Sequence, residues 1–279
     1  MASLLFSPGD DPGPSFLELL RRADALPVVP EAAGDRIAHT HGTTVVAIRY
    51  ADGVVMAGDR RATSGNLISH RAMEKVYPAD RYSGVAIAGA AGPAMDMVKL
   101  FQLQLEHYEK VEGVELSLEG KATQLSAFVR GHLPMAMQGL VVVPLFAGYD
   151  TRRGTGRLFQ YDVTGGRYEE SNFATTGSGS LHAGTVVKLG WREGIDREDT
   201  LDLAISALFN AADEDSATGG PDLVRGIYPT IATITATGFD RVVESEVADR
   251  FRALVDRLST PESTATAGSS PTMPEGGDR

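Results

Sequence analysis

Residues 41–63 have the sequence HGTTVVAIRYADGVVMAGDRRAT, and this stretch decides the fold. Two runs rich in β-branched and apolar residues, Thr44–Tyr50 and Val54–Gly58, lie on either side of Ala51-Asp52-Gly53. An Asp-Gly pair between two such runs is a strong local signal for a β-hairpin. The stretch therefore predicts two antiparallel strands, the first of which begins directly after Gly42-Thr43.

The rest of the chain continues in blocks of strands and pairs of helices. The patterns predict strands at 75–77, 83–88, 140–149, 156–163, 168–175 and 230–237, and helices at 93–109, 118–137, 180–191, 197–212 and 246–258. Strands that cluster in blocks favour antiparallel sheets with helices outside them over a βαβ alternation. We therefore expect an α+β fold in which two sheets lie face to face and helices cover both outer sides.

Composition limits the classes of protein. The chain has 279 residues, 42% of them hydrophobic, which is enough to bury a core. Its 26 basic and 37 acidic residues give a formal charge of −11, and this balance argues against a nucleic-acid partner. It has no cysteine, which excludes a disulfide scaffold, a thiolate nucleophile and a Cys-ligated metal. No pattern calls for a metal or an organic cofactor.

The two ends of the chain differ from its middle. Residues 1–42 are rich in Pro, Gly and Asp, and residues 259–279 in Ser, Thr, Pro and Gly, so the folded domain is expected at 43–258 with a disordered tail after it. The N-terminus lacks the basic start and apolar run of a secretory signal. The longest apolar stretch, 140–148, is too short to cross a bilayer. These features predict a cytoplasmic protein without a membrane partner.

The informative chemical feature is the junction Gly42-Thr43, since the sequence has no Walker A loop, no HExxH and no Gly-x-Ser-x-Gly elbow. A strand start without chemistry is one interpretation of this junction. If the chain is cut there, however, the Thr43 hydroxyl and a new α-amine lie on one residue. An amine with a pKa of about 7.7–8.0 can take the hydroxyl proton at neutral pH, so Thr43 becomes a candidate nucleophile.

Residues further along can support such a nucleophile. A lysine held near Thr43, such as Lys75, would lower the pKa of the hydroxyl, and Asp59 would keep that lysine charged and in position. The small residues at 88–92 can direct a backbone N–H at an oxyanion. Each feature also has a plain interpretation, as a surface lysine, a turn and a tightly packed corner.

Together these residues resemble the β-subunits of the 20S proteasome in their actinobacterial form, over residues 43 to about 258. The resemblance rests on six motifs in order: Gly42-Thr43-Thr44, Gly58–Thr63 (GDRRAT), Met73–Val76 (MEKV), Ala88–Ala91 (AGAA), Gly177–Ser180 (GSGS) and Asp213–Gly220 (DEDSATGG). It implies an N-terminal-nucleophile hydrolase fold, a four-layer αββα sandwich. It also implies a threonine endopeptidase that is made as a zymogen.

The resemblance further implies the roles of individual residues. Residues 1–42 would be a propeptide, autocatalytic cleavage would fall at Gly42-Thr43, and Thr43 would be the nucleophile. The remaining catalytic roles go to Asp59 and Lys75 as charge partners, Gly89 as the oxyanion N–H, and Ser178, Asp215 and Thr218 as the groups around the new amine. At the last of these positions the family more often has serine, and the hydroxyl is retained here.

The substrate site is implied in the same way. Thr63 and Ala91 would bind the substrate backbone, and the pocket for the residue before the cut would be lined by Ala62, Met73, Ile87, Ala91 and Met95. These side chains are small or flexible and apolar, so we expect a chymotrypsin-like preference for apolar or aromatic residues. The alternative for the two methionines is that they simply fill the core.

The resemblance also implies an assembly. Family members form an α7β7β7α7 barrel from heptameric rings, in which α-subunits and a ring ATPase control the entry of unfolded substrates tagged with the prokaryotic ubiquitin-like protein. One alternative is a simpler bacterial threonine peptidase whose rings contain one subunit type, which an active ring of this chain alone would indicate. A structural β-type subunit that does not cut, or a binding module with a coincidental Thr-Thr strand, fits less well because the candidate catalytic residues are all present.

Overall fold

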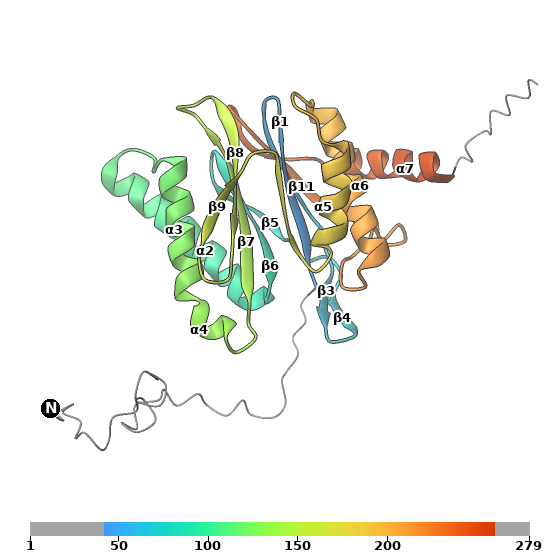
Figure 1. Cartoon of the computed structure of the whole chain (residues 1–279), viewed down its shortest axis with the longest axis horizontal. Helices are drawn as coiled ribbons and strands as arrows, with labels where there is room; N and C mark the ends of the chain where they lie inside the picture. Colours follow the sequence, from blue (N-terminus) through green and yellow to red (C-terminus); the bar gives the residue numbers. More distant parts are fainter. Residues whose placement is uncertain (1–41, 260–279) are drawn as a thin grey trace, which may run out of the picture. The chain divides into compact units, whose positions relative to one another are not determined.

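The computed structural model describes residues 42–259, so the expected leader at 1–41 and the tail from residue 260 onward lie outside the described residues. In the described part, two five-stranded antiparallel sheets lie face to face between two layers of helices (Figure 1). A separate two-stranded ribbon, β3 (Ala62–Ser64) and β4 (Leu67–His70), extends beside them. The predicted αββα sandwich is confirmed.

The first sheet contains the hairpin of the deciding stretch. Its strands, in spatial order, are β10 (Phe173–Gly177), β1 (Thr44–Tyr50), β2 (Gly53–Gly58), β11 (Thr230–Thr235) and β12 (Gly238–Arg241). Pairing of Tyr50 with Gly53 leaves two residues in the turn, and the predicted hairpin is confirmed. A methyl group at Gly53 would lie 2.0 Å from the carbonyl oxygen of Ile234, so the approach of β11 requires glycine there.

The second sheet and the helices complete the sandwich. Its strands are β5 (Val76–Asp80), β6 (Ser83–Gly89), β7 (Val142–Asp150), β8 (Thr155–Tyr161) and β9 (Arg167–Glu170). The helices that cover it are α2 (Ala91–Glu112), α3 (Leu118–Gly131) and α4 (Leu133–Ala136). On the side of the first sheet lie α5 (Ser180–Gly190), α6 (Arg197–Glu214) and α7 (Glu244–Ser259).

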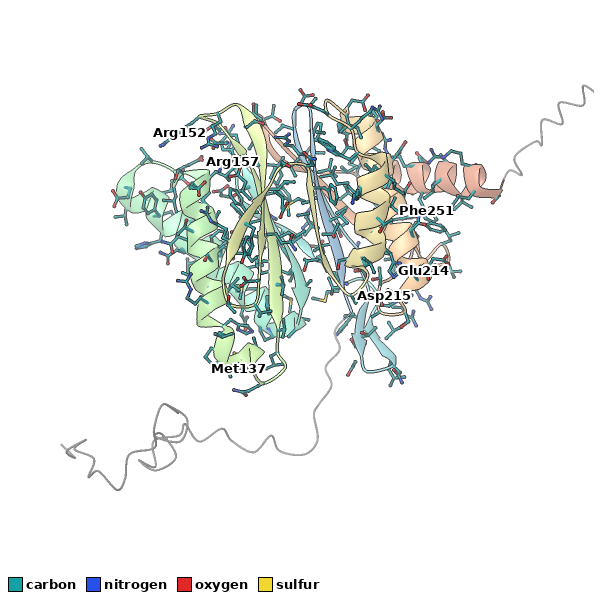
Figure 2. The ribbon with its side chains drawn as sticks, in the orientation of Figure 1. Met137, Arg152, Arg157, Glu214, Asp215 and Phe251 are labelled. Atoms are coloured by element: carbon teal, nitrogen blue, oxygen red, sulfur yellow. The ribbon has the colours of Figure 1, made fainter. Side chains whose placement is uncertain are left out.

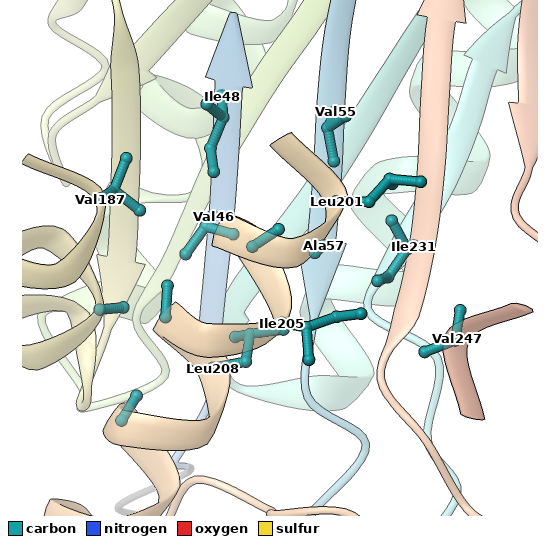
Figure 3. Packing of buried hydrophobic residues seen from close by; sticks show 14 of the residues in the cluster. Val46, Ile48, Val55, Ala57, Val187, Leu201, Ile205, Leu208, Ile231 and Val247 are labelled. Atoms are coloured by element: carbon teal, nitrogen blue, oxygen red, sulfur yellow. The ribbon is translucent and has the colours of Figure 1, made fainter. Parts of the chain in front are cut away.

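Strand β1 shows how the layers are held together. Val46 and Ile48 point toward α5 and α6, where they pack in one apolar cluster (Figure 3). Val45 and Ala47 point to the opposite face and pack between the two sheets. Successive side chains of a strand lie on opposite faces, so a strand between two buried layers must be apolar on both. Full burial of one such side chain stabilises the fold by about 1.5–3 kcal/mol.

Two of the predicted elements are each divided into two in the structure. The predicted strand 168–175 is two strands, because the chain bends at Ser171-Asn172 and leaves the second sheet to pair with β1. The predicted helix 118–137 ends at Gly131, and a short helix with Pro134 in its first turn follows. Proline has no N–H for a continued helical bond, which explains the break.

Other strands were not expected from the sequence. The predicted strand 230–237 ends at Thr235, and a turn leads from it into β12. Strands β3 and β4, next to the candidate site, were also missed. All three are short, with three or four residues each, so hydrophobic periodicity has little to act on.

Candidate active site

Thr43 lies directly before β1 and is almost completely buried. Its carbonyl oxygen accepts a hydrogen bond from the backbone N–H of Ser178 at 2.9 Å. The next residue, Thr44, pairs with Gly177 at the end of β10. The backbone of the candidate nucleophile is therefore fixed between β1 and the turn that leads into α5.

A buried ion pair lies beside this strand start. Asp59 follows β2 and Lys75 precedes β5, and the side chains of both are at most 1% exposed. Lys75 Nζ lies 2.6 Å from Asp59 Oδ1 and also donates to the carbonyl oxygen of Arg61 at 2.5 Å. Burial lowers the pKa of the Lys75 ammonium, and the Asp59 carboxylate opposes that shift. The end of β2 and the segment before β5 thus hold the Lys75 ammonium group in a fixed orientation and away from solvent.

The Asp59 carboxylate connects this cation to the backbone of the site. Its Oδ1 accepts the N–H of Thr44 at 2.9 Å as well as the lysine. Its Oδ2 accepts the N–H groups of Arg61 at 2.9 Å and Gly219 at 2.8 Å. Hydrogen bonds to an ionised acceptor are among the strong ones, so four donors fix this carboxylate. Lys75 and the residue after Thr43 therefore bind the same oxygen atom.

A second carboxylate, Asp215, follows the end of α6 and lies next to Glu214 (Figure 2). The hydroxyl of Thr218 donates to its Oδ2 at 2.6 Å, and the hydroxyl of Ser178 donates to the same oxygen. Burial alone would raise the pKa of Asp215, but these hydrogen bonds and one from the N–H of Ala217 outweigh it, so the pKa lies below its ordinary value. The structure brings together the three residues that the family resemblance assigns to the surroundings of the amine, and that role stays a prediction.

Thr44 also belongs to this site, although its place in the Gly42-Thr43-Thr44 motif implied no role for its side chain. It is fully buried, and its Oγ1 lies 2.5 Å from Oγ1 of Thr218 and accepts the N–H of Gly179 at 3.0 Å. Buried hydroxyls need hydrogen-bond partners. No pattern in the sequence identifies this hydroxyl, because threonine is an ordinary strand residue.

Gly42 lies on the other side of the peptide bond that is expected to be cut. Its N–H donates to Oγ1 of Thr63 at 3.3 Å, so Thr63 contacts the backbone of the residue before the bond. A methyl group on Gly42 would lie 1.8 Å from Cβ of Ala217. The space at this position therefore admits only a glycine.

Gly89 ends β6 with φ of +112°, and a methyl group there would lie 2.0 Å from the carbonyl oxygen of Val141. Both observations require glycine. The strand runs past Lys75, because the N–H of Ile87 donates to the Lys75 carbonyl oxygen at 2.9 Å. The assignment of the Gly89 N–H to an oxyanion stays a prediction.

The predicted pocket residues occupy several elements. Ala62 and Thr63 lie on β3, Met73 is half-buried before Lys75, Ile87 is buried in the core beneath α2, and Ala91 and Met95 lie on α2, with Met95 38% exposed. Their assignment to a substrate pocket stays a prediction. Among residues 42–259, no group of three or more His, Asp or Glu side chains is arranged to hold a metal ion. The same residues include no helix long and apolar enough to span a membrane.

The fold defines a class. Two antiparallel sheets lie face to face between helices, and Thr43 comes directly before an inner strand, as in the N-terminal-nucleophile hydrolase fold. The profile of the family described as "Proteasome subunit" matches residues 39–224. The chain is 55% identical to "Proteasome subunit beta" of Acidimicrobium ferrooxidans, over 89% of this chain and 92% of that one. It is 57% identical to "Proteasome subunit beta" of Streptomyces griseus, over 81% of each chain. The chain therefore belongs to the family of proteasome β-type subunits, and the resemblance seen in the sequence is confirmed.

Proposed function

We propose that this chain is the catalytic β-subunit of a proteasome core and acts as a threonine endopeptidase. The observation that carries the proposal is the Asp59–Lys75 pair, buried against the start of β1 and sharing one carboxylate oxygen with the N–H of Thr44. Burial of a charge costs free energy. A subunit that only lines a ring gains nothing from a lysine buried here, whereas a threonine nucleophile gains a lowered hydroxyl pKa.

The proposed reaction begins when Oγ of Thr43 attacks the scissile carbonyl carbon and its proton passes to the α-amine. The Lys75 ammonium stabilises the developing alkoxide, and the N–H of Gly89 stabilises the oxyanion. The C–N bond then breaks, the leaving amine takes the proton from the α-ammonium, and an ester on Thr43 remains. Water hydrolyses this ester with the α-amine as the base, which restores the enzyme.

Maturation uses the same nucleophile. While residues 1–42 are attached, the nitrogen of Thr43 is an amide and cannot act as a base, so the leader keeps the peptidase inactive. Attack of the Thr43 hydroxyl on the Gly42 carbonyl carbon breaks the Gly42–Thr43 C–N bond, and the hydroxyl proton passes to the departing nitrogen. The leader is then an ester on Thr43, and water hydrolyses this ester with the freed α-amine as the base, which releases the leader. The absence of a side chain on Gly42 and the contact of its N–H with Thr63 support this assignment.

Assembly and substrates follow from the same proposal. The subunit assembles with α-type subunits into an α7β7β7α7 barrel in the cytoplasm, where a ring ATPase feeds unfolded proteins tagged with the prokaryotic ubiquitin-like protein. Exposed apolar side chains on three separate segments support extensive subunit contacts: Leu67 of β4 at 75%, Leu189 of α5 at 83% and Val224, in the turn region after α6, at 92% exposure. The apolar character of the predicted pocket residues supports a chymotrypsin-like preference.

The testing experiment measures the intact mass and the N-terminal sequence of the subunit after co-expression with its α-type partner. We expect the wild type to begin at Thr43 and the Thr43→Ala variant to retain residues 1–42 and show no peptidase activity. Full maturation of Thr43→Ala without another protease would refute the mechanism. Active rings formed by the chain alone would instead favour the peptidase with one subunit type.

A further inference from the structure

The Thr44 hydroxyl lies at the centre of the site and has no part in the reaction proposed above. Thr44 is fully buried, with Gly179 N at 3.0 Å and Thr218 Oγ1 at 2.5 Å from its Oγ1. A valine has almost the same shape and leaves no hydroxyl to be satisfied. What needs an explanation is therefore the hydroxyl and not the volume of the side chain.

The hydrogen bonds of the Thr44 and Thr218 hydroxyls run in one direction. Thr218 donates its hydroxyl proton to Oδ2 of Asp215, because an ionised carboxylate only accepts. Thr218 Oγ1 must then accept the proton of Thr44, and Thr44 Oγ1 accepts the N–H of Gly179. The result is a one-way chain from the Gly179 N–H through two hydroxyls to Asp215.

The chain begins at the N-terminus of a helix. Gly179 is the N-cap of α5, and no side chain caps this helix end by a hydrogen bond. The N–H groups of a helix start carry partial positive charge. A hydroxyl that accepts a hydrogen bond becomes a better donor, so each link of the chain strengthens the next.

The surrounding packing leaves these hydroxyls little freedom. A methyl group at Gly179 would lie 2.5 Å from Oγ1 of Thr44 and 2.8 Å from Oγ1 of Thr218. The absence of a side chain on Gly179 is thus what allows the helix start, β1 and the segment after α6 to meet at one hydroxyl pair. The neighbouring Ser178 hydroxyl donates to the same oxygen, Oδ2 of Asp215, so both hydroxyl donors to this oxygen lie beside the turn that contains Gly179.

We propose that Thr44 is a positioning residue, whose hydroxyl holds the Thr218 hydroxyl on Asp215 and thereby fixes the groups around the α-amine of Thr43. This inference rests on the proposed function, because the amine exists only after the leader is removed. Thr44 touches neither the substrate nor the reacting atoms in this scheme, and it acts through Thr218.

The test compares two variants of the α-type and β-type complex that change opposite properties of the side chain. Thr44→Val keeps the shape and removes the hydroxyl, whereas Thr44→Ser keeps the hydroxyl and removes the methyl group. With a fluorogenic peptide carrying an apolar residue before the cut, we expect kcat of Thr44→Val to fall roughly 5- to 20-fold with KM within about twofold. Thr44→Ser should stay within about twofold of the wild type. An unchanged kcat in Thr44→Val, or an equal loss in Thr44→Ser, would overturn the proposal.

A double-mutant cycle tests the route through Thr218. If Thr44 acts through Thr218, the variant with both threonines changed to valine should lose no more kcat than Thr218→Val alone, whereas independent effects would multiply and refute the route. Native mass spectrometry verifies assembly, and Thr44→Ala, which adds no bulk, replaces Thr44→Val if that variant does not assemble. A wild-type complex without peptidase activity would refute the proposed function and this inference with it, whereas an active wild type beside an unaffected Thr44→Val would refute only the inference.

Discussion

Replacement of Gly42 by alanine is expected to block maturation without altering the mature enzyme. The added methyl carbon would lie 1.8 Å from Cβ of Ala217, and 2.6 and 2.7 Å from its Cα and carbonyl carbon. Carbon atoms in contact normally lie about 3.5–4.0 Å apart, so a displacement on the order of 1.5 Å is needed. Ala217 cannot yield easily, because its N–H donates to Oδ1 of Asp215 at 3.1 Å. Gly42 must therefore move.

The rate effect follows from what Gly42 carries. Its carbonyl carbon is the atom that the Thr43 hydroxyl attacks in the proposed maturation. A misplacement of about 1 Å can reduce the rate of a positioned reaction roughly 100-fold. We expect the Gly42→Ala precursor to mature at least about 100-fold more slowly than the wild type.

The assay follows the intact mass of the subunit over time after assembly with the α-type partner. The matched control is Gly131→Ala, because a methyl group at Gly131 meets no atom within 4 Å and should leave maturation unchanged. In the proposed maturation, residue 42 leaves with the propeptide, so any mature enzyme from Gly42→Ala is expected to have the specific activity of the wild type. Maturation of Gly42→Ala at the wild-type rate would refute the steric reasoning, and a mature fraction with altered kcat would refute the position of the cut.

Three further predictions concern ionised groups. Lys75→Ala should abolish both maturation and peptide hydrolysis and lower the free energy of unfolding by about 3–5 kcal/mol, because it leaves the Asp59 carboxylate buried without its cation. The control Lys121→Ala breaks a different ion pair, so in denaturant titration it should lose stability, whereas mass spectrometry should show that it still matures. Hydrogen bonds hold the pKa of Asp215 below its ordinary value, so Thr218→Val should raise that pKa and move the acidic limb of the kcat/KM profile to higher pH. An acidic limb that does not move would mean that the Asp215 carboxylate does not control it. Arg157 (Figure 2) is 5% exposed and pairs with three carboxylates, so Arg157→Met should lower the free energy of unfolding by roughly 2–4 kcal/mol in denaturant titration. Maturation, followed by intact mass, should proceed normally, and loss of maturation at full stability would contradict this prediction.

The parts of the fold that could be predicted are those decided locally. The β1–β2 hairpin follows from an Asp-Gly turn between two strand-forming runs, and propensity, pattern and turn chemistry agree there. The bend at Ser171-Asn172 could not be predicted, because the change of sheet depends on pairing with β1, which is remote in sequence. The strands β3 and β4 could not be predicted because they are too short to show a hydrophobic pattern.

The candidate site divides in the same way. Thr43, Asp59 and Lys75 could be proposed because their order and types fit one chemistry, and the structure adds that one carboxylate oxygen joins the lysine to the strand start. The Thr44 hydroxyl could not be found by pattern, because threonine is an ordinary strand residue. The structure shows that this hydroxyl is buried and accepts the N–H of Gly179, and packing of an apolar side chain does not explain why a hydroxyl is there.

The proposed inactivity of the precursor can be explained by which groups around Thr43 are already in position before the Gly42–Thr43 bond is cut. With Gly42 still joined to Thr43, the Asp59–Lys75 pair is formed and the Ser178 and Thr218 hydroxyls already donate to Asp215. The precursor thus holds its charged and hydroxyl groups in the arrangement that the proposed reaction uses, and what it lacks is the free α-amine. Under the proposed mechanism, inactivity comes from one acylated nitrogen and needs no distorted site, so removal of the leader would activate the peptidase without refolding the groups around Thr43.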